Sequence, residues 1–260
     1  MQDVRFASIY SASYHLLVKS RQEVPNMKKS VNTGVSGLDE LLDGGLPEGS
    51  VTVLSGPPGV GKSTIAMQYL YEGVQKGEPG LLLSIESNTS DALSYASAFN
   101  WDFDKYVKEG KLMILDRSIF EESEMQLSHD FGALRDIMKE MKPKRFVVDS
   151  VTFFDFLFRD EIAKKMNIMR FIDLMKTNDC TTIMTLKQSE NFPNIQYNEW
   201  HFLSDGLLAM FWNRNHAENE RCIWAVKMRE RNIDTNIHPI KITEKGVVIY
   251  TNDVPSITAP

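Results

Sequence analysis

The stretch SGPPGVGKST, residues 55–64, decides the fold class of this 260-residue chain. It follows the apolar run VTVL and opens a segment whose apolar residues recur with helical spacing. The pattern G-x-x-x-x-G-K-[ST] between a strand and a helix is typical of a P-loop, in which backbone N–H groups and the positive end of the helix dipole surround phosphates. The dinucleotide-binding fingerprint is excluded, because Gly61 is followed by Lys-Ser-Thr and no third glycine comes at the required offset.

The residues of this loop predict a site for a nucleotide and its Mg²⁺ ion. Lys62 supplies a positive charge for the β- and γ-phosphates, and the hydroxyl of Ser63 is placed to ligate the metal. The residues expected to bind the nucleotide are Gly56, Pro57, Pro58, Gly59, Val60, Gly61, Lys62, Ser63 and Thr64.

Two carboxylates are candidates for completing this site. Asp149 ends the run RFVVD (145–149) and is the Walker B candidate, which holds the metal, although an acid at this place is also a common helix cap. Glu86 ends GLLLSIE (80–86) and is the candidate that orients the attacking water. Its alternative is a solvated acid in a loop. Both would lie at the carboxyl edge of a parallel sheet, where ligands bind.

Beyond the loop, short apolar runs alternate with helical patterns, which predicts a mostly parallel twisted sheet flanked by helices. After Asp205 three apolar segments follow one another without a helix, so we expect a C-terminal antiparallel extension with a turn at 244–246. The predicted strands are 51–55, 80–85, 112–116, 145–149 and 181–186. The predicted helices are 62–75, 89–98, 130–141 and 161–177.

The composition narrows the classes of partner. A net charge of −6 and a pI near 5.5 oppose binding to nucleic acid and anionic lipid, so protein or small-molecule partners are expected. Two distant cysteines and five unclustered histidines give no disulfide framework and no zinc pattern. No apolar stretch reaches the length of a membrane span, and the expected location is cytoplasmic.

The N-terminus allows two interpretations. Residues 1–27 are expected to form an extension before one domain at 28–260. This extension is either real, or translation starts at Met27, because Gln22-Glu23-Val24 can be encoded by a purine-rich ribosome-binding sequence a few nucleotides upstream. The polar residues within FASIYSASYHLLV (6–18) argue against a signal peptide.

Several collinear segments resemble KaiC-family ATPases, in the RecA-like branch of P-loop proteins. They are VNTGVSGLDELLDGGLPEGSVTVLSGPPGVGKSTIAMQYLYEG (31–73), FNWDFDKYVKEGKLMILD (99–116), RFVVDSVTFF (145–154), FLSDGLLAM (202–210) and VKMRERNIDTNIHPIKITEKGVVI (226–249). The resemblance implies a RecA-like fold with ATP and Mg²⁺ as ligands.

The resemblance also implies roles for particular residues. Glu86 matches the first of two adjacent catalytic glutamates, and Ser87 replaces the second. Lys227 and Arg229 match a K-x-R pair that reaches the γ-phosphate bound to the neighbouring subunit, although residues i and i+2 of a strand also simply share a face. A homo-oligomer is thus implied, as a hexameric ring or, if the rotation does not close, a helical filament.

The same likeness argues against clock-type autokinase activity. His201 and Phe202 stand where the phosphate-accepting Ser-Thr pair of KaiC would be. The chain is similar to single-domain KaiC-like proteins, and we expect a self-assembling ATPase that serves as a regulatory or signalling switch.

Two other functions stay open. A nucleotide-gated scaffold with little hydrolysis is favoured by the loss of the second glutamate. A DNA-repair ATPase like the recombinases would need basic loops at 153–165 and 188–204, but the second has no Lys or Arg and the first has balanced charges. Gln188 lies where RecA-like proteins can place a polar sensor of the γ-phosphate.

Overall fold

The computed structural model describes residues 28–116, 131–158, 160–188, 195–214, 219–253 and 255. The predicted extension at 1–27 lies outside these residues. So do parts of the two loops compared with recombinases, including Arg159 and the stretch 189–194.

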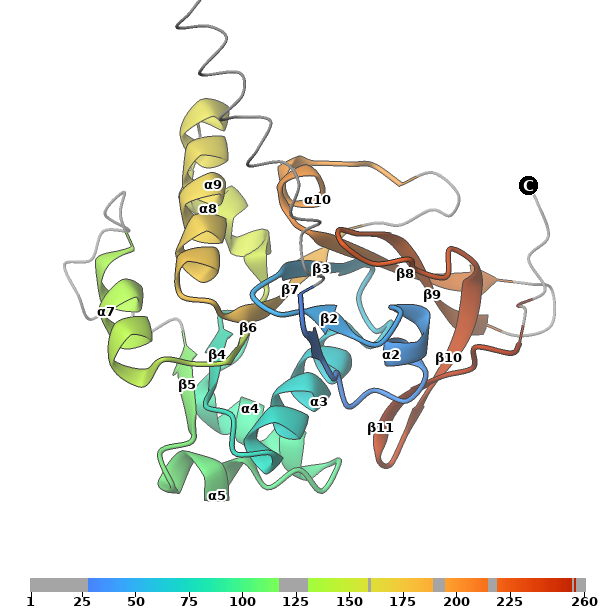
Figure 1. Ribbon diagram of the computed structural model, residues 1–260, viewed down its shortest axis with the longest axis horizontal. Coiled ribbons are helices and arrows are strands. Elements are labelled where there is room, and N and C mark those ends of the chain that lie inside the picture. The colour runs from blue at the N-terminus through green and yellow to red at the C-terminus, as the bar shows by residue number, and fades with distance from the viewer. Residues whose placement is uncertain are drawn as a thin grey trace, which may run out of the picture.

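Nine strands of the described chain form one sheet, in the order β11-β10-β9-β8-β3-β7-β6-β4-β5 (Figure 1). The parallel part comprises β3 (Val51–Gly56), β4 (Gly80–Ser84), β5 (Leu112–Asp116), β6 (Arg145–Asp149), β7 (Thr181–Lys187) and β8 (Gly206–Arg214). The antiparallel part comprises β9 (Asn219–Met228), β10 (Ile237–Thr243) and β11 (Gly246–Ile249). The predicted mostly parallel sheet with an antiparallel extension is confirmed, but the change of direction falls after β8, since β8 still pairs in parallel with β3.

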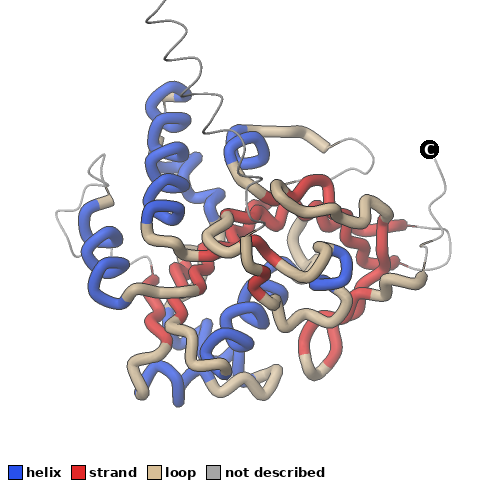
Figure 2. Tube along the Cα trace, in the orientation of Figure 1, coloured by secondary structure: helices blue, strands red, loops and turns tan. Residues whose placement is uncertain are grey.

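Helices cover both faces of this sheet (Figure 2). One face carries α2 (Leu38–Leu41), α3 (Lys62–Gln75), α4 (Thr89–Ser97) and α5 (Phe103–Lys108). The other carries α7 (Gly132–Met141), α8 (Phe154–Leu157), α9 (Glu161–Thr177) and α10 (Glu199–Leu203), with a 3₁₀ turn, η1 (Val151–Phe153), before α8. A small second sheet joins β1 (Ser30–Val31) to β2 (Leu46–Pro47). The fold is therefore a three-layer α/β arrangement.

Alternation along the strands explains why two cores form. In β4, Leu82 faces the core with α3, while Leu81 and Leu83 face the core with α9. A strand with apolar residues on both faces reads as a continuous apolar run, which made these strands visible in the sequence. No described helix is long and apolar enough to cross a membrane.

The pairing register brings the ends of four strands together. Asp149 at the end of β6 pairs with Ser84 near the end of β4, and Gly56 at the end of β3 pairs with Lys187 at the end of β7. The sequences that follow these strands consequently meet at one carboxyl edge. This is the edge at which the parallel fold places a ligand.

Candidate functional site

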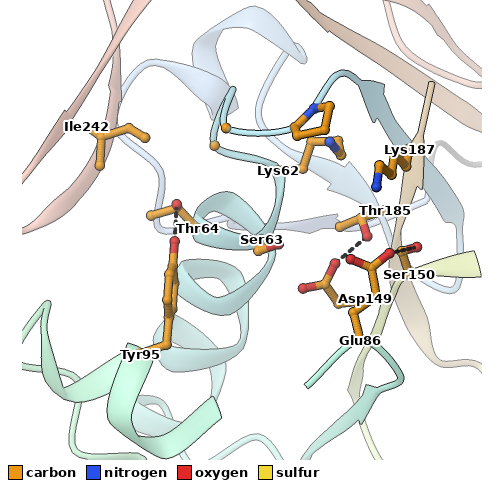
Figure 3. A pocket seen from close by; sticks show the side chains of 13 residues that line it. Lys62, Ser63, Thr64, Glu86, Tyr95, Asp149, Ser150, Thr185, Lys187 and Ile242 are labelled. Atoms are coloured by element: carbon orange, nitrogen blue, oxygen red, sulfur yellow. Dashed lines mark hydrogen bonds between the residues drawn. The ribbon is translucent and has the colours of Figure 1, made fainter. Parts of the chain in front are cut away.

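A pocket of about 290 Å³ opens at this carboxyl edge (Figure 3). Thirteen residues from the P-loop, α3, α4 and the ends of three strands and their loops surround it, with one residue from β10. They are Pro58, Gly59, Gly61, Lys62, Ser63, Thr64, Glu86, Tyr95, Asp149, Ser150, Thr185, Lys187 and Ile242. Most of the predicted P-loop residues, with both predicted carboxylates, thus line one cavity.

The three remaining P-loop residues support the pocket from behind. Val60 is buried in the core beside α3. Gly56 and Pro57 present their carbonyls to Lys62, whose Nζ donates hydrogen bonds of 2.7 and 2.8 Å to them. A Cβ on Gly56 would come within 2.2 Å of the carbonyl oxygen of Met210, so this position requires glycine.

The acidic side of the pocket is held by hydroxyl groups. Thr185 donates a hydrogen bond to Asp149, and Ser150 Oγ donates one of 2.9 Å to Glu86 Oε1 (Figure 3). Burial raises the pKa of Asp149 above its ordinary value, and the hydrogen bonds from Thr185 and Ser63 oppose that rise. The charge of Glu86 raises the pKa of Asp149 further.

These residues fit Mg²⁺. Two carboxylates in a partly desolvated pocket repel each other, and a cation bound among Asp149, Ser63 and the phosphates would relieve that repulsion. Among the described residues, no cluster of three His, Cys, Asp or Glu side chains forms a metal site by itself. The ion would accordingly depend on the nucleotide for much of its coordination, as is usual for Mg²⁺.

The opposite wall of the pocket contains residues that the sequence did not mark. The hydroxyl of Tyr95 in α4 lies 2.7 Å from Thr64 Oγ1, and Ile242 of β10 lies beyond it (Figure 3). Thr185 and Lys187 were detectable in principle, since they lie near and just after the end of the predicted strand 181–186. Tyr95 and Ile242 were not, because only the packing of α4 and β10 beside the P-loop brings them there.

Lys227 and Arg229 lie near the other end of the sheet. Lys227 pairs with Leu207, which pairs with Val53, about 10 Å along β3 from its carboxyl end. Their partners lie at the end of α10 and just after it: Lys227 Nζ donates to the carbonyls of Ser204, at 2.8 Å, and Phe202, at 3.4 Å, and Arg229 forms a 3.1 Å ion pair with Asp205. The structure does not bring this pair into the pocket of the same chain.

Gln188 and His201 meet the P-loop strand from outside the pocket. The N–H of Gln188 donates to the carbonyl of Gly56 at 3.1 Å, and Ser55 Oγ donates to Gln188 Oε1 at 3.4 Å. His201 is buried, with Nε2 at 3.1 Å from Ser55 Oγ. Phe202, its neighbour, is 63% exposed.

The described parts of the two loops compared with recombinases offer few unpaired cations. Lys164 pairs with Asp155 at 3.3 Å and with Glu161 at 3.0 Å, and Lys165 pairs with Glu199 at 3.0 Å. Ion pairs inside a loop weaken its attraction for phosphate. This agrees with the sequence-based argument against a DNA-binding function.

Aromatic residues of the same loops divide between core and surface. Trp200 is buried, with its ring 4.9 Å from that of Phe154, whereas Phe156, Tyr197 and Phe202 are exposed. Tyr197 and Phe202 pack together, with ring centroids 6.1 Å apart. Within the described parts of these loops, no basic groove of the kind that binds single-stranded nucleic acid accompanies the exposed rings, since Lys164 and Lys165 are ion-paired.

The fold and the pocket together define a P-loop nucleotide-binding protein of the RecA type, with its phosphate loop after β3 and an acidic residue at the end of β6. Residues 31–254 match the family model described as KaiC ATPase. The chain belongs to the KaiC family, and this membership supports ATP binding at the P-loop.

Individual relatives agree with this assignment. A UPF0273 protein of Thermotoga maritima is 29% identical over 87% of this chain and 98% of its own length, and one of Pyrococcus furiosus is 31% identical over 88% and 96%. The circadian clock oscillator protein KaiC of Parathermosynechococcus lividus is 32% identical over 84% of this chain but only 42% of its own length. A crystal structure of a KaiC-like protein from Pyrococcus horikoshii superposes with a TM-score of 0.76 at 28% identity, covering 86% of this chain and 99% of that one.

Proposed function

We propose that this protein is a Mg²⁺-dependent ATPase that self-assembles and serves as a regulatory or signalling switch. The observation that carries the proposal is the pocket that joins Lys62 and Ser63 to Glu86 and Asp149. In this proposal Lys62 supplies the positive charge that binds phosphate, Ser63 and Asp149 supply oxygens to the metal, and Glu86 is the carboxylate beside the attacking water.

The proposed chemistry assigns one task to each group. Lys62 leaves the carbonyls of its own loop to bind the β- and γ-phosphates, while Ser63 and Asp149 hold the metal side. Glu86, oriented by Ser150, accepts the proton of the attacking water. When bound, Mg²⁺ would neutralise charge on the phosphate oxygens.

We further propose that each site is completed by the neighbouring subunit. Lys227 and Arg229 lie at the other end of the sheet from their own pocket, and Arg229 is exposed. A head-to-tail contact between subunits would bring one subunit's pair to the next subunit's pocket, where cations stabilise charge that develops during phosphoryl transfer. A closed hexameric ring is the proposed assembly, and the same contact would give a filament if it did not close.

ATPase rate measured against protein concentration, together with light scattering, tests this proposal. Turnover per subunit is expected to rise as the assembly forms, to fall in Lys227→Ala and Arg229→Ala, and to ignore single-stranded DNA. A rate stimulated by DNA would replace the proposal with a recombinase-like function.

A mixing experiment tests the shared site directly. Subunits with Glu86→Gln keep Lys227 and Arg229, and subunits with Lys227→Ala/Arg229→Ala keep Glu86. Mixed assemblies should regain turnover that neither variant shows alone, because some pockets then have both halves. No recovery in verified mixed assemblies would contradict a site completed in trans.

One observation favours the scaffold as a second candidate function. Ser87, in place of a second glutamate, lies with its Oγ 2.7 Å from Ser84 Oγ and does not line the pocket. If the wild type and Glu86→Gln hydrolyse ATP equally slowly while both assemble with nucleotide, the scaffold function is correct and the ATPase function is wrong.

A further inference from the structure

A short segment, residues 201–205, is hydrogen-bonded near both ends of strand β3. At the carboxyl end, His201 Nε2 lies 3.1 Å from Ser55 Oγ, one residue before the P-loop glycine. At the amino end, Asp205 Oδ2 accepts the N–H of Val51 at 3.0 Å. About 13 Å of extended chain separates Val51 from Ser55. The segment therefore links the base of the P-loop to the other end of the sheet.

The contacts of His201 determine its protonation. Its Nδ1 accepts the N–H of Asn198 at 2.9 Å, so that nitrogen carries no proton. Ser55 donates its hydroxyl proton to Gln188 Oε1, so Ser55 Oγ accepts the proton of His201 Nε2. His201 is thus a neutral imidazole that joins the cap of α10 to the last residue before the P-loop.

The other end of this segment binds Lys227 and Arg229, the two residues proposed to act in trans. Lys227 Nζ donates to the carbonyls of Ser204, at 2.8 Å, and Phe202, at 3.4 Å, where the carboxyl end of α10 favours a cation. Arg229 bonds to Asp205 at 3.1 Å. A movement of α10 would displace both cations.

The nucleotide side of the link begins at the carbonyl of Gly56. This oxygen accepts hydrogen bonds from both Lys62 Nζ, at 2.7 Å, and the N–H of Gln188, at 3.1 Å. When Lys62 turns to phosphate, Gly56 loses one of these bonds, and Gln188 and Ser55 are the groups next to it. A chain of hydrogen bonds continues from there to His201.

We propose that His201 is a positioning residue that transmits the nucleotide state of one subunit's P-loop to Lys227 of that subunit, and so to the neighbour's site. His201 is not among the residues that line the pocket. This inference rests on the proposed trans function of Lys227. It adds a route by which one site in the assembly influences the next.

Two substitutions at His201 form a matched pair. The amide of His201→Gln reaches the place of Nε2 and keeps the donor to Ser55, but it loses the acceptor for Asn198. The amide of His201→Asn reaches the place of Nδ1 and keeps the cap, but it loses the donor to Ser55. Each variant removes one of two hydrogen bonds, so similar losses of stability are expected.

The test uses the mixed assemblies described above. Each His201 variant is added to the subunit that already carries Glu86→Gln and supplies Lys227 to its neighbour. His201→Asn there should lower the recovered turnover roughly tenfold, with KM for ATP unchanged within about twofold, while His201→Gln should retain it within about twofold. Ser55→Ala in the same subunit removes the contact from the other side and should match His201→Asn.

The outcomes separate the inference from the function beneath it. Equal turnover with His201→Gln and His201→Asn at matched melting temperatures overturns the inference, because a purely structural histidine predicts that result. Full turnover with Ser55→Ala also overturns it. If the mixture without any His201 substitution fails to recover activity, the proposed trans function is wrong, and the inference about His201 is then wrong as well.

Discussion

At the scale of single residues, the two carboxylates that we propose for catalysis are oriented by hydroxyl groups that belong to no motif. Glu86 is exposed and takes its orientation from Ser150, while Asp149 is partly buried and bonded by Thr185. A hydroxyl donor fixes each carboxylate without adding charge to the pocket. Both carboxylates could therefore be predicted from strand ends. Of the groups that orient them, Thr185 was detectable in principle from its place near a strand end, whereas the bond from Ser150 to Glu86 depends on the pairing of β4 with β6.

Glu86→Gln is expected to lower the steady-state turnover of ATP about 100-fold or more, because an amide cannot accept a proton from water. ATP affinity, measured by equilibrium titration, should change less than about threefold, since the amide oxygen still accepts the bond from Ser150. The control Ser150→Ala keeps the carboxylate and should reduce turnover less than tenfold or so. Equal losses in the two variants would mean that Glu86 acts only as part of the pocket's framework.

His201 predicts a pH dependence of stability. Burial, and then the charge of Lys227, lower its pKa from 6.5 to about 4. The unfolded chain therefore binds the proton first, and the stabilisation is complete above about pH 6.5 and is lost as the pH falls towards 4, on the order of 3 kcal/mol.

Urea unfolding between pH 7 and pH 4 measures this effect. The free energy of unfolding should fall less steeply in His201→Gln than in the wild type, because glutamine does not titrate. Asp205, whose pKa is lowered by Lys176 and the N–H of Val51 against the effect of burial, contributes only below this window. Parallel pH profiles for the two proteins would contradict the assignment of a neutral His201.

At the scale of elements, the buried strands and the long helices could be predicted from the sequence, whereas a short helix whose position depends on tertiary packing could not. The parallel strands were visible because both faces are apolar, and α3 because a P-loop must open a helix. Helix α10 has five residues, too few for a periodic pattern, and its cap depends on Asn198 and His201 bonding to each other. Its contact with Ser55, 146 residues away in the chain, follows from the tertiary fold and no local pattern records it.

Helix α3 gives a prediction about its packing on β6. Arg145 is 1% exposed, with its guanidinium 4.6 Å from the ring of Tyr69, and a Cβ on Gly73 would come within 2.3 Å of its Cδ. Gly73→Ala should therefore destabilise the fold by about 1–3 kcal/mol, although the same change normally stabilises a helix.

Thermal or chemical unfolding of Gly73→Ala measures that cost. The matched control is Ser94→Ala on the exposed face of α4, which should change stability by less than about 0.5 kcal/mol. A Gly73→Ala protein as stable as the wild type would show that Arg145 moves aside without loss of its bond to the carbonyl of Tyr69.

At the scale of the whole molecule, the cavity and the Lys227 pair lie near opposite ends of one sheet. The alternative to a functional K-x-R pair was two residues that share one face of a strand, but β9 ends at Met228, so Lys227 lies in the strand and Arg229 just after it. The sequence could not say which end of the sheet the pair occupies. That placement depends on β8 pairing in parallel with β3 before β9 turns back. This separation supports the proposal that the pair acts on a neighbouring subunit's pocket more directly than the motif does.

The domain boundary is also a prediction at this scale. A chain of residues 27–260 should melt within about 2 °C of the full chain and keep its ATPase rate, because it keeps all the residues that the family model matches, 31–254, and the 2.8 Å hydrogen bond from Arg231 to the carbonyl of Lys28. Differential scanning calorimetry and turnover assays measure this. A large drop in melting temperature would make the extension part of the domain, and the control Arg231→Ala reports the value of that first contact.

The bonds that residues 201–205 make with β3 also limit how members of this family can be recombined. A chimera that takes its P-loop strand from one relative and the region around α10 from another would pair a foreign residue with His201 at one end and with Asp205 at the other. Exchange should succeed when residues 51–56 and 201–205 are transplanted as one unit, even though 144 residues lie between them in the chain. The response to nucleotide and the contact between subunits would then pass to a chimera together, and neither could be transferred alone.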